Sequence, residues 1–352
     1  MRYKLLGKSG LRVSELCLGA MTFGEDWGWG ASRQESKKMY DAFRKIGGNF
    51  IDTANIYTNG TSEKFVGEFL RKDRDEVVLA TKYSNSTNPD DPNASGNHRK
   101  NVKRSLEASL KRLKTDYIDL YWIHYWDFMT PVEEVMRALD DLIRSGKVLY
   151  IGISDAPAWV VSRANTMAEL IGWSQFIGLQ IEYSLVERTP ERELLPMARS
   201  MDIGVTPWSP LGSGVLTGKY NKNKKSASDG KRVEAIKDMM SEDYANRIVS
   251  DRNLEIAREV LNIADESGKT PAQVAINWVR QKPGVMVPIL GARKLSQLKD
   301  NLGCLDFELT HDQMDRLNKV SEIKLGFPHD FLSSEEIRRI TLGNTYSLID
   351  KK

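Results

Sequence analysis

The sequence predicts an α/β protein in which about eight short, buried, parallel strands alternate with helices. Apolar runs rich in valine and isoleucine recur along the 352 residues, and apolar residues at helical spacing lie between them. Runs of this kind are typical of parallel strands that are covered on both faces. Eight such units are compatible with a (β/α)₈ barrel or with a doubly wound open sheet.

The strand-like runs appear in a regular order along the chain. They are residues 16–18, 50–51, 77–80, 117–123, 148–153, 177–181, 203–205 and 285–287. The best helical pattern lies between the fourth and fifth runs, where apolar residues stand at positions 132, 135, 136, 139, 142 and 143. Thr130-Pro131, Thr189-Pro190 and Thr270-Pro271 each predict a helix start, with threonine as the cap and proline in the first turn.

The absence of phosphate motifs separates the two candidate folds. No strand-like run is followed by G-x-G-x-x-G, and the sequence contains neither G-x-x-x-x-G-K-[ST] nor G-x-S-x-G. The glycine cluster at 24–30 contains two tryptophans and does not fit a dinucleotide turn. A Rossmann-type open sheet is therefore disfavoured, and the barrel is the better prediction.

Two segments interrupt the alternation of strands and helices. A long insertion at about 211–248, polar and rich in lysine over 219–232, precedes the last strand, and a tail follows from about 319 to 352. The insertion is a solvated loop or a flap over an anionic ligand. We expect the tail to extend over the barrel mouth. No linker divides the chain, so we expect one domain over residues 1–352.

Composition excludes several classes of protein. Lys plus Arg number 51 and Asp plus Glu 48, a formal charge of +3 that disfavours a nucleic-acid-binding protein and a polybasic membrane anchor. No 18-residue apolar stretch and no signal-peptide pattern are present. Only two cysteines occur, without metal-ligand spacing, so we expect no metal site and a reducing, cytoplasmic setting. A homo-oligomer is compatible with the sequence.

Polar residues stand where six successive strands are expected to end. They are Asp52 and Tyr57, Lys82, His124, Ser154-Asp155, Gln180 and Trp208. In a βα barrel these positions gather at one face. Each residue alone is more often structural. Together they suggest acid catalysis, because a lysine lowers the pKa of a nearby tyrosine, an aspartate holds the lysine, and a histidine orients a carbonyl oxygen.

These residues belong to motifs that resemble the aldo-keto reductase superfamily over essentially the whole chain. The resemblance is closest to bacterial members of its aryl-alcohol-dehydrogenase-like and potassium-channel-β-like branches. The matching blocks are Asp52-Thr53-Ala54-x-x-Tyr57, Thr81-Lys82, Ile123-His124-x-x-Asp127, Gly152-Ile153-Ser154, Gln180-x-x-Tyr183-Ser184, Trp208-Ser209-Pro210-Leu211-Gly212 and Gly291-Ala292-Arg293-x-x-x-Gln297-x-x-Asp300-Asn301.

The resemblance implies a (β/α)₈ barrel that binds NADPH and reduces an aldehyde or ketone to the alcohol. It makes Tyr57 the general acid, Lys82 the group that lowers its pKa, and Asp52 the partner of Lys82, while His124 orients the substrate. The implied cofactor residues are Gly19, Ala20, Met21 and Asp52 in the groove; Ser154, Asp155 and Gln180 on the carboxamide; Trp208 on the nicotinamide; Ser209, Pro210, Leu211, Gly212, Ser213 and Lys219 on the pyrophosphate; and Gly291, Arg293 with Lys294, Gln297, Asp300 and Asn301 at the adenosine phosphate end.

One position departs from the pattern of the superfamily. The residue after Ser154 is commonly asparagine there, and it is Asp155 here. An ionised carboxylate accepts hydrogen bonds but cannot donate one to the carboxamide oxygen. Asp155 is therefore a less secure cofactor ligand than Ser154 or Gln180.

Aromatic residues in two loops predict the substrate class. Trp27 and Trp29 follow the first strand, and Trp126 and Phe128 follow the fourth, near Tyr57 and His124. They favour an aromatic or flat carbonyl, although tryptophan also stacks on sugars. The alternative to an enzyme is a nucleotide-binding regulatory subunit of the channel-β type with little turnover, and the intact set of four catalytic residues favours the enzyme.

Overall fold

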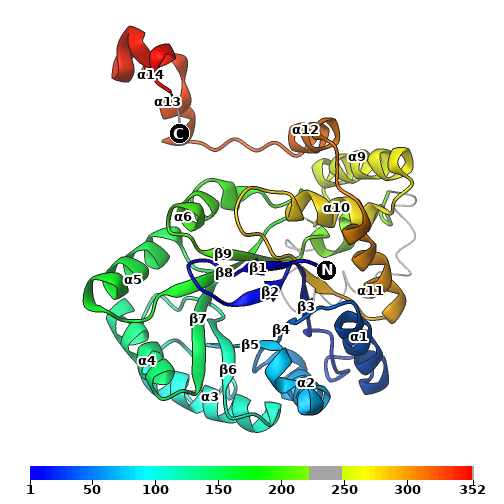
Figure 1. The fold of residues 1–352 in the computed structure, drawn as a ribbon, viewed down its shortest axis with the longest axis vertical. Coiled ribbons are helices and arrows are strands. Elements are labelled where there is room, and N and C mark those ends of the chain that lie inside the picture. The colour runs from blue at the N-terminus through cyan, green and yellow to red at the C-terminus, as the bar shows by residue number, and fades with distance from the viewer. Residues whose placement is uncertain (222–247, 351–352) are drawn as a thin grey trace.

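Eight parallel strands form the barrel in the computed structural model, which describes residues 1–221 and 248–350. The order around the sheet follows the chain from β3 to β9, and β10 pairs with β3 (Figure 1). The strands are β3 Cys17–Gly19, β4 Phe50–Asp52, β5 Val78–Tyr83, β6 Ile118–Ile123, β7 Val148–Ser154, β8 Phe176–Glu182, β9 Gly204–Trp208 and β10 Ile289–Gly291.

The eighth strand of the barrel differs from its prediction. The expected run at 285–287 forms only a bridge, in which Val287 N–H donates to Val205 O at 2.9 Å, and β10 itself begins at Ile289. Pro288, which lacks an N–H, lies between these two parts. One part therefore contacts β9 and the next pairs with β3, and together they close the ring.

Helices surround the barrel as the alternation predicts (Figure 1). They are α1 Arg33–Lys45, α2 Thr61–Phe69, α3 Arg99–Leu113, α4 Val132–Arg144, α5 Ala158–Ile171, α6 Leu194–Ser200, α9 Asp251–Ser267, α10 Pro271–Arg280, α11 Leu295–Leu302 and α12 His311–Val320. Their buried apolar faces and the outer faces of the strands form the main core. This ring fixes the strand ends, and so it fixes the residues that follow them.

The three predicted helix starts have different outcomes. Thr270 caps α10 with the full capping box, so that prediction is confirmed. Thr130 does not cap α4, because its hydroxyl donates to Asp127 Oδ2 at 2.7 Å and Pro131 takes the cap position. Thr189-Pro190 opens only a 3₁₀ turn, and α6 begins later, at Leu194. Loop contacts outweigh the local signal in the last two cases.

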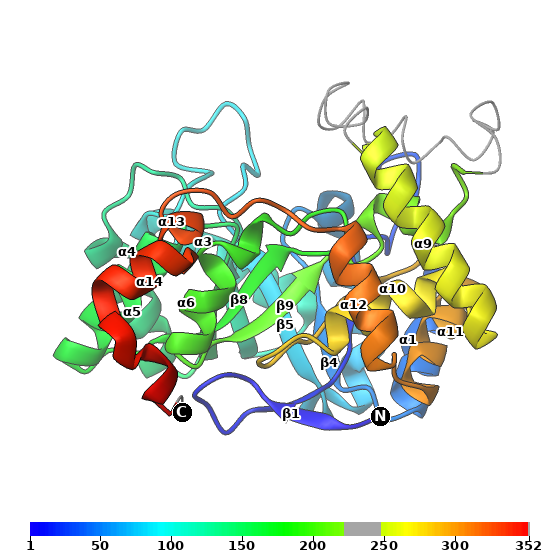
Figure 2. The ribbon, with the colours of Figure 1, turned by 90° about the horizontal axis from the view of Figure 1, so that it is seen from above.

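A hairpin that the sequence analysis did not predict closes the floor of the barrel. Strands β1 Tyr3–Leu5 and β2 Arg12–Ser14 pair antiparallel and lie below the barrel strands (Figure 2). Leu6 and Val13 from this hairpin are fully buried in the barrel-interior cluster. The turn approaches the barrel closely at Gly7, where a Cβ would lie 2.3 Å from Ile177 O. Only glycine fits there.

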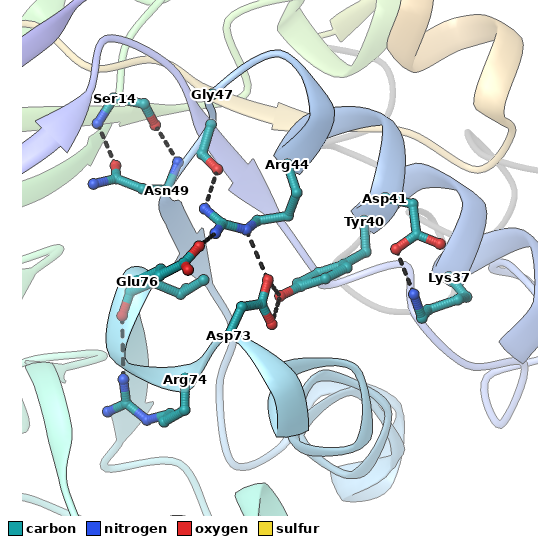
Figure 3. A network of polar contacts seen from close by, with 12 residues as sticks. Ser14, Lys37, Tyr40, Asp41, Arg44, Gly47, Asn49, Asp73, Arg74 and Glu76 are labelled. Carbon is teal, nitrogen blue, oxygen red and sulfur yellow. Dashed lines mark hydrogen bonds and ion pairs between the residues drawn. The ribbon is translucent and has the colours of Figure 1, made fainter.

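Polar contacts tie the floor together (Figure 3). The Arg44 guanidinium in α1 donates to Asp73 at 2.9 Å and to Glu76 at 2.8 Å, and the Tyr40 hydroxyl donates to Asp73 at 2.9 Å. Ser14 N–H donates to Asn49 Oδ1 at 2.6 Å and joins the hairpin to the strand that starts beside it. These contacts anchor the amino ends of the first strands.

The barrel interior is filled directly below the mouth by one large side chain. Trp122 in β6 is fully buried. Its indole covers two glycines of the next strands, because a Cβ at Gly152 would lie 2.3 Å from the ring and one at Gly178 would lie 2.7 Å from it. The mouth therefore rests on a packed layer, as expected for a barrel of this kind.

The insertion and the tail have different outcomes. Residues 222–247 of the expected insertion, with most of its lysine-rich part, lie outside the described residues. The tail is not over the mouth. It forms α13 His329–Ser333 and α14 Glu335–Leu342, which lie outside the ring of helices (Figure 1). Arg192 Nη2 donates to Lys324 O at 2.9 Å and His329 contacts Glu193 at 2.9 Å, so polar contacts next to α6 hold the tail at the flank.

Candidate active site

A fully buried lysine stands at the centre of the candidate site. Lys82 in β5 is 0 % exposed, and its ammonium donates to Asp52 Oδ2, to Thr53 O at 2.9 Å and to the Tyr57 hydroxyl oxygen at 3.1 Å. Its three N–H donors thus have three acceptors. Burial alone would lower the pKa of Lys82, but Asp52 and Tyr57 outweigh it and raise the pKa above its ordinary value. The charged form is therefore secured beside Tyr57.

The pKa of Tyr57 is raised, whereas the sequence analysis expected Lys82 to lower it. Burial raises the pKa of Tyr57 to about 12, while the Lys82 charge acts in the opposite, lowering direction. The lysine contribution has the expected sign, but burial is the larger effect. Tyr57 consequently keeps its proton at neutral pH and can act as a proton donor.

Asp52 is fixed from two sides. Its Oδ2 accepts from Lys82, and its Oδ1 accepts from the Gln180 amide at 3.2 Å. Asp52 ends β4 and Gln180 lies in β8, so this contact crosses the barrel. The structure thus brings together the predicted lysine partner and one predicted carboxamide ligand.

His124 lies beside Tyr57 in the neutral form. Their ring centroids are 5.7 Å apart and nearly perpendicular, at 84°. Burial, with a contribution from Lys82, holds the pKa of His124 well below 6.5. Its Nδ1 is buried and has no hydrogen-bond partner in the described part of the chain. A neutral imidazole at this place can contact a carbonyl oxygen without carrying charge.

Tyr125 is a residue of the site that the sequence analysis missed. Its ring stacks on His124 with centroids 4.5 Å apart and planes inclined by 14°, while 48 % of Tyr125 remains exposed. It stands directly after His124 in the sequence, and that adjacency was the available signal. Tyr125 forms one exposed aromatic wall of the site.

Asp155 and Trp208 are joined by a hydrogen bond. The Trp208 indole N–H donates to Asp155 Oδ1 at 3.1 Å, between the ends of β9 and β7. Burial raises the pKa of Asp155 to about 6, although the Trp208 contact and Lys82 lower it. The neighbouring Ser154 hydroxyl is buried, and its interaction with the Asp155 carboxylate also lowers the pKa of Asp155.

A strained turn follows β9. Residues Gly212–Thr217 form a 3₁₀ segment in which Ser213 and Gly214 take left-handed φ values of 54° and 91°. Ser209 braces it, since its hydroxyl accepts from Ser213 N–H at 3.0 Å. The Lys219 side chain lies against this turn, because a Cβ at Gly214 would be 3.3 Å from its ammonium. The turn and the lysine make a basic cradle that suits a pyrophosphate.

The residues after β10 divide into two groups. Arg293 is partly exposed, and its backbone N–H donates to Gln297 Oε1 at 3.0 Å at the start of α11. Asp300 is instead engaged by Thr270 Oγ1 and by the Gln273 amide, each at 3.2 Å. Asp300 therefore joins two helices, and we remove it from the proposed cofactor ligands. Asn301 is buried beside it.

The residues at the end of β3 lie beside Asp52. Gly19 pairs with Gly291 of β10, and Ala20 N–H donates to Asp52 O at 2.8 Å. Met21 follows and is partly exposed. The small residues keep this segment close to Asp52.

Only two of the four predicted substrate aromatics, apart from the catalytic residues, stand at the site. Trp27 lies 6.4 Å from the Tyr57 ring and 5.8 Å from Trp29. Trp126, by contrast, is 8 % exposed and packs in the main core, and Phe128 is 71 % exposed on a turn. The loop after β6 thus turns one ring inward to the core and leaves the other exposed, and their contact with substrate stays a prediction.

Comparison with known proteins agrees with this geometry. Residues 15–322 match the Aldo/keto reductase family. A norsolorinic acid reductase of Aspergillus flavus is 38 % identical over 93 % of this chain and 83 % of its own length. An aryl-alcohol dehydrogenase [NADP(+)] of Phanerodontia chrysosporium is 37 % identical over 91 % of this chain and 86 % of its own length.

The chain belongs to the aldo/keto reductase family. The expected family and the (β/α)₈ barrel are thus confirmed, and membership makes the protein an oxidoreductase. Among residues 1–221 and 248–350, no helix is long and apolar enough to cross a membrane. The same residues hold no cluster of three or more potential metal ligands.

Proposed function

We propose that this aldo/keto reductase transfers hydride from NADPH to an aldehyde or ketone and donates the proton from Tyr57. The observation that carries the proposal is the buried ammonium of Lys82, which donates to Tyr57 at 3.1 Å while Asp52 holds it from the other side. Such a contact stabilises the phenolate that remains after the proton has left.

Polar groups at the mouth support a nicotinamide nucleotide as the cofactor. Ser154, with its buried hydroxyl, is paired in register with Gln180 of the next strand. The strained turn with Lys219 and the partly exposed Arg293 supply positive charge for phosphates. When bound, the nucleotide supplies the hydride. An arginine near the adenosine end favours NADPH over NADH, in agreement with the name of the related NADP(+) enzyme.

Residues of the chain place the substrate, donate the proton and stabilise the phenolate. His124 places the carbonyl oxygen near the Tyr57 hydroxyl, since the two rings lie 5.7 Å apart. As hydride reaches the carbonyl carbon, Tyr57 gives its proton to the oxygen and the C=O group becomes CH–OH. Lys82 stays protonated and stabilises the phenolate until solvent returns the proton.

The aromatic walls favour an aromatic or flat carbonyl. Trp27 contacts Tyr57 and packs on Trp29, and Tyr125 stacks on His124. Rings of this kind offer apolar area and stacking to a planar substrate. The names of the related aryl-alcohol dehydrogenase and norsolorinic acid reductase agree with this substrate class.

Tryptophan fluorescence tests the proposal first. Trp208 is expected against the nicotinamide, so NADPH should quench emission and bind more tightly than NADH. Addition of 4-nitrobenzaldehyde should then oxidise the bound NADPH, and Tyr57→Phe should abolish this oxidation without abolishing the quenching.

The other outcomes separate the alternatives. Quenching without oxidation for a range of aromatic, aliphatic and sugar-derived carbonyls would indicate a nucleotide-binding regulatory protein. Binding of neither nucleotide would overturn the proposed cofactor site as a whole.

A further inference from the structure

Asp155 is held in a fixed position at the barrel mouth by its backbone and by one neighbour. It follows β7 with a left-handed φ of 44°, which an L-residue rarely adopts. The turn directs its carboxylate to β9, where Oδ1 accepts from the Trp208 indole N–H at 3.1 Å. An asparagine could make the same contact, so the contact alone does not explain the presence of a carboxylate here.

The nearest groups leave the charge of this carboxylate uncompensated. Lys82 is the cation that acts on Asp155, but Lys82 is already paired with Asp52. His124 is neutral because its pKa lies well below 6.5, and Tyr57 is neutral because its pKa is about 12. The ion pair of Lys82 and Asp52 therefore contributes no net charge, and Asp155 adds one negative charge.

The other charged groups near these strand ends lie away from the Trp208 hydrogen bond. Lys219 lies against Gly214 in the turn after β9, and Glu182 at the end of β8 is in register with Trp208. Tyr125 is protonated, because burial and Asp155 raise its pKa. The carboxylate that accepts from the Trp208 indole is that of Asp155.

We propose that the Asp155 carboxylate makes the site prefer the oxidised, positively charged nicotinamide over the reduced, neutral one. The proposal rests on the proposed function, in which the nicotinamide lies on Trp208. A negative charge held at the edge of that ring stabilises only the form that carries a positive charge. It does so without changing the contacts that both forms share.

The preference should depend on pH in a defined direction. Burial raises the pKa of Asp155 to about 6, so the carboxyl is neutral well below this pH and ionised above it. The ratio of the dissociation constants, Kd(NADP⁺)/Kd(NADPH), should therefore fall by about tenfold from pH 5 to pH 8. Protonation of the nucleotide's 2′-phosphate cancels in this ratio, because both forms carry that group.

Asp155→Asn tests the proposal with nearly the same shape. The amide oxygen can still accept from Trp208, but the charge is gone. Fluorescence titrations with NADP⁺ and NADPH should show that the variant has a ratio about tenfold higher than the wild type at pH 8. At pH 5 the two proteins should agree. The matched control is Glu182→Gln, which removes one charge from the same rim but leaves the Trp208 hydrogen bond intact, and it should change the ratio much less.

A second measurement needs no nucleotide. In ¹⁵N-labelled protein, the Trp208 indole N–H resonance should shift with a midpoint near pH 6 and should be insensitive to pH in Asp155→Asn. The midpoint of this shift shows whether protonation of the Asp155 carboxylate affects the Trp208 indole N–H.

The outcomes distinguish this inference from the proposed function. If both nucleotides bind but Asp155→Asn leaves their ratio unchanged at pH 8, the role of Asp155 is wrong and the cofactor site stands. If Glu182→Gln changes the ratio as much as Asp155→Asn, the effect is a general field and the inference is also wrong. If neither nucleotide binds, the proposed function fails, and this inference fails with it.

Discussion

The floor and the mouth of the barrel satisfy their polar groups in different ways. At the floor, Arg44 bonds to two carboxylates, and Arg280 donates to Glu15 at 2.8 Å, with both side chains of that pair less than a tenth exposed. At the mouth, His124 Nδ1 is buried without a hydrogen-bond partner among the described residues. Buried polar groups are normally paired. The unpaired His124 nitrogen is therefore available to a ligand at the mouth, whereas the unpaired hydroxyls of Tyr83 and Tyr121 lie in the main core.

The backbone shows the same contrast. Of the nine non-glycine residues with positive φ that the structure describes, seven lie in loops that follow the carboxyl ends of strands: Thr58, Asn59, Ser84, Phe128, Asp155, Ser209 and Ser213. Only Lys114 and Asp202 lie at the opposite side. Such conformations cost free energy and gather at functional sites. Contacts at the floor stabilise the fold. The positive φ values at the mouth cost part of that free energy and position the side chains there.

The strongest test of this division is Lys82→Met, because Lys82 belongs to both the fold and the chemistry. Its removal leaves Asp52 without its charge partner and Tyr57 without a cation. We expect a loss of about 3–5 kcal/mol in the free energy of unfolding and a fall of about 10³-fold in kcat. Urea unfolding and single-turnover kinetics on folded protein measure the two effects separately.

Arg112→Met is the matched control. It breaks another buried pair, in which Glu63 is 0 % exposed and also accepts from Thr81, while Asp52, Lys82 and Tyr57 keep their own contacts. Stability should fall similarly, while kcat per folded molecule should stay the same. An equal loss of kcat in both variants would mean that Lys82 acts only through stability.

The fold was predictable because each unit of the barrel repeats one signal. Buried apolar runs, most of them containing valine or isoleucine, identified seven strands and came within a few residues of the eighth. The hairpin was missed because β1 and β2 are short, and each pairs only with the other and not with the barrel. The position of the tail was missed because polar contacts next to α6, distant in sequence, determine it.

At the floor, Arg44→Ala should affect stability alone. The Arg44 side chain is 17 % exposed, and its guanidinium bonds to Asp73, Glu76 and the Gly48 carbonyl. Losing these contacts should lower the free energy of unfolding by about 2 kcal/mol. Arg163→Ala, which breaks an exposed pair with Glu133, should cost only ~0.5 kcal/mol. A change in kcat for Arg44→Ala would contradict the separation of floor from mouth.

The candidate site was predictable only where one motif carries each role. Asp52, Tyr57, Lys82 and His124 meet as their positions at strand ends indicate. The roles of aromatic residues were harder to infer, because the direction of a loop side chain depends on tertiary packing. For that reason Trp126 packs in the core, while Tyr125 beside it stacks on His124 at the site.

Trp29→Ala should test the substrate wall. Trp29 packs on Trp27, which faces Tyr57, so its loss should raise KM for aromatic aldehydes about tenfold. KM for a small aliphatic aldehyde should change little. Trp159→Ala, at a ring 59 % exposed on α5, is the control and should change neither constant. An equal rise for both substrate types would show that Trp29 supports the loop and not the substrate.

The smallest expected effect is that of pH on kcat. A general acid works in its protonated form, and the pKa of Tyr57 is about 12, so Tyr57 should keep its proton throughout the range from pH 7 to 9. His124 stays neutral over the same range because its pKa lies well below 6.5. With saturating NADPH and 4-nitrobenzaldehyde, kcat should therefore vary by less than about threefold over this range. A tenfold fall per pH unit that persists in His124→Gln would mean that the Lys82 charge outweighs burial and brings the pKa of Tyr57 near neutrality.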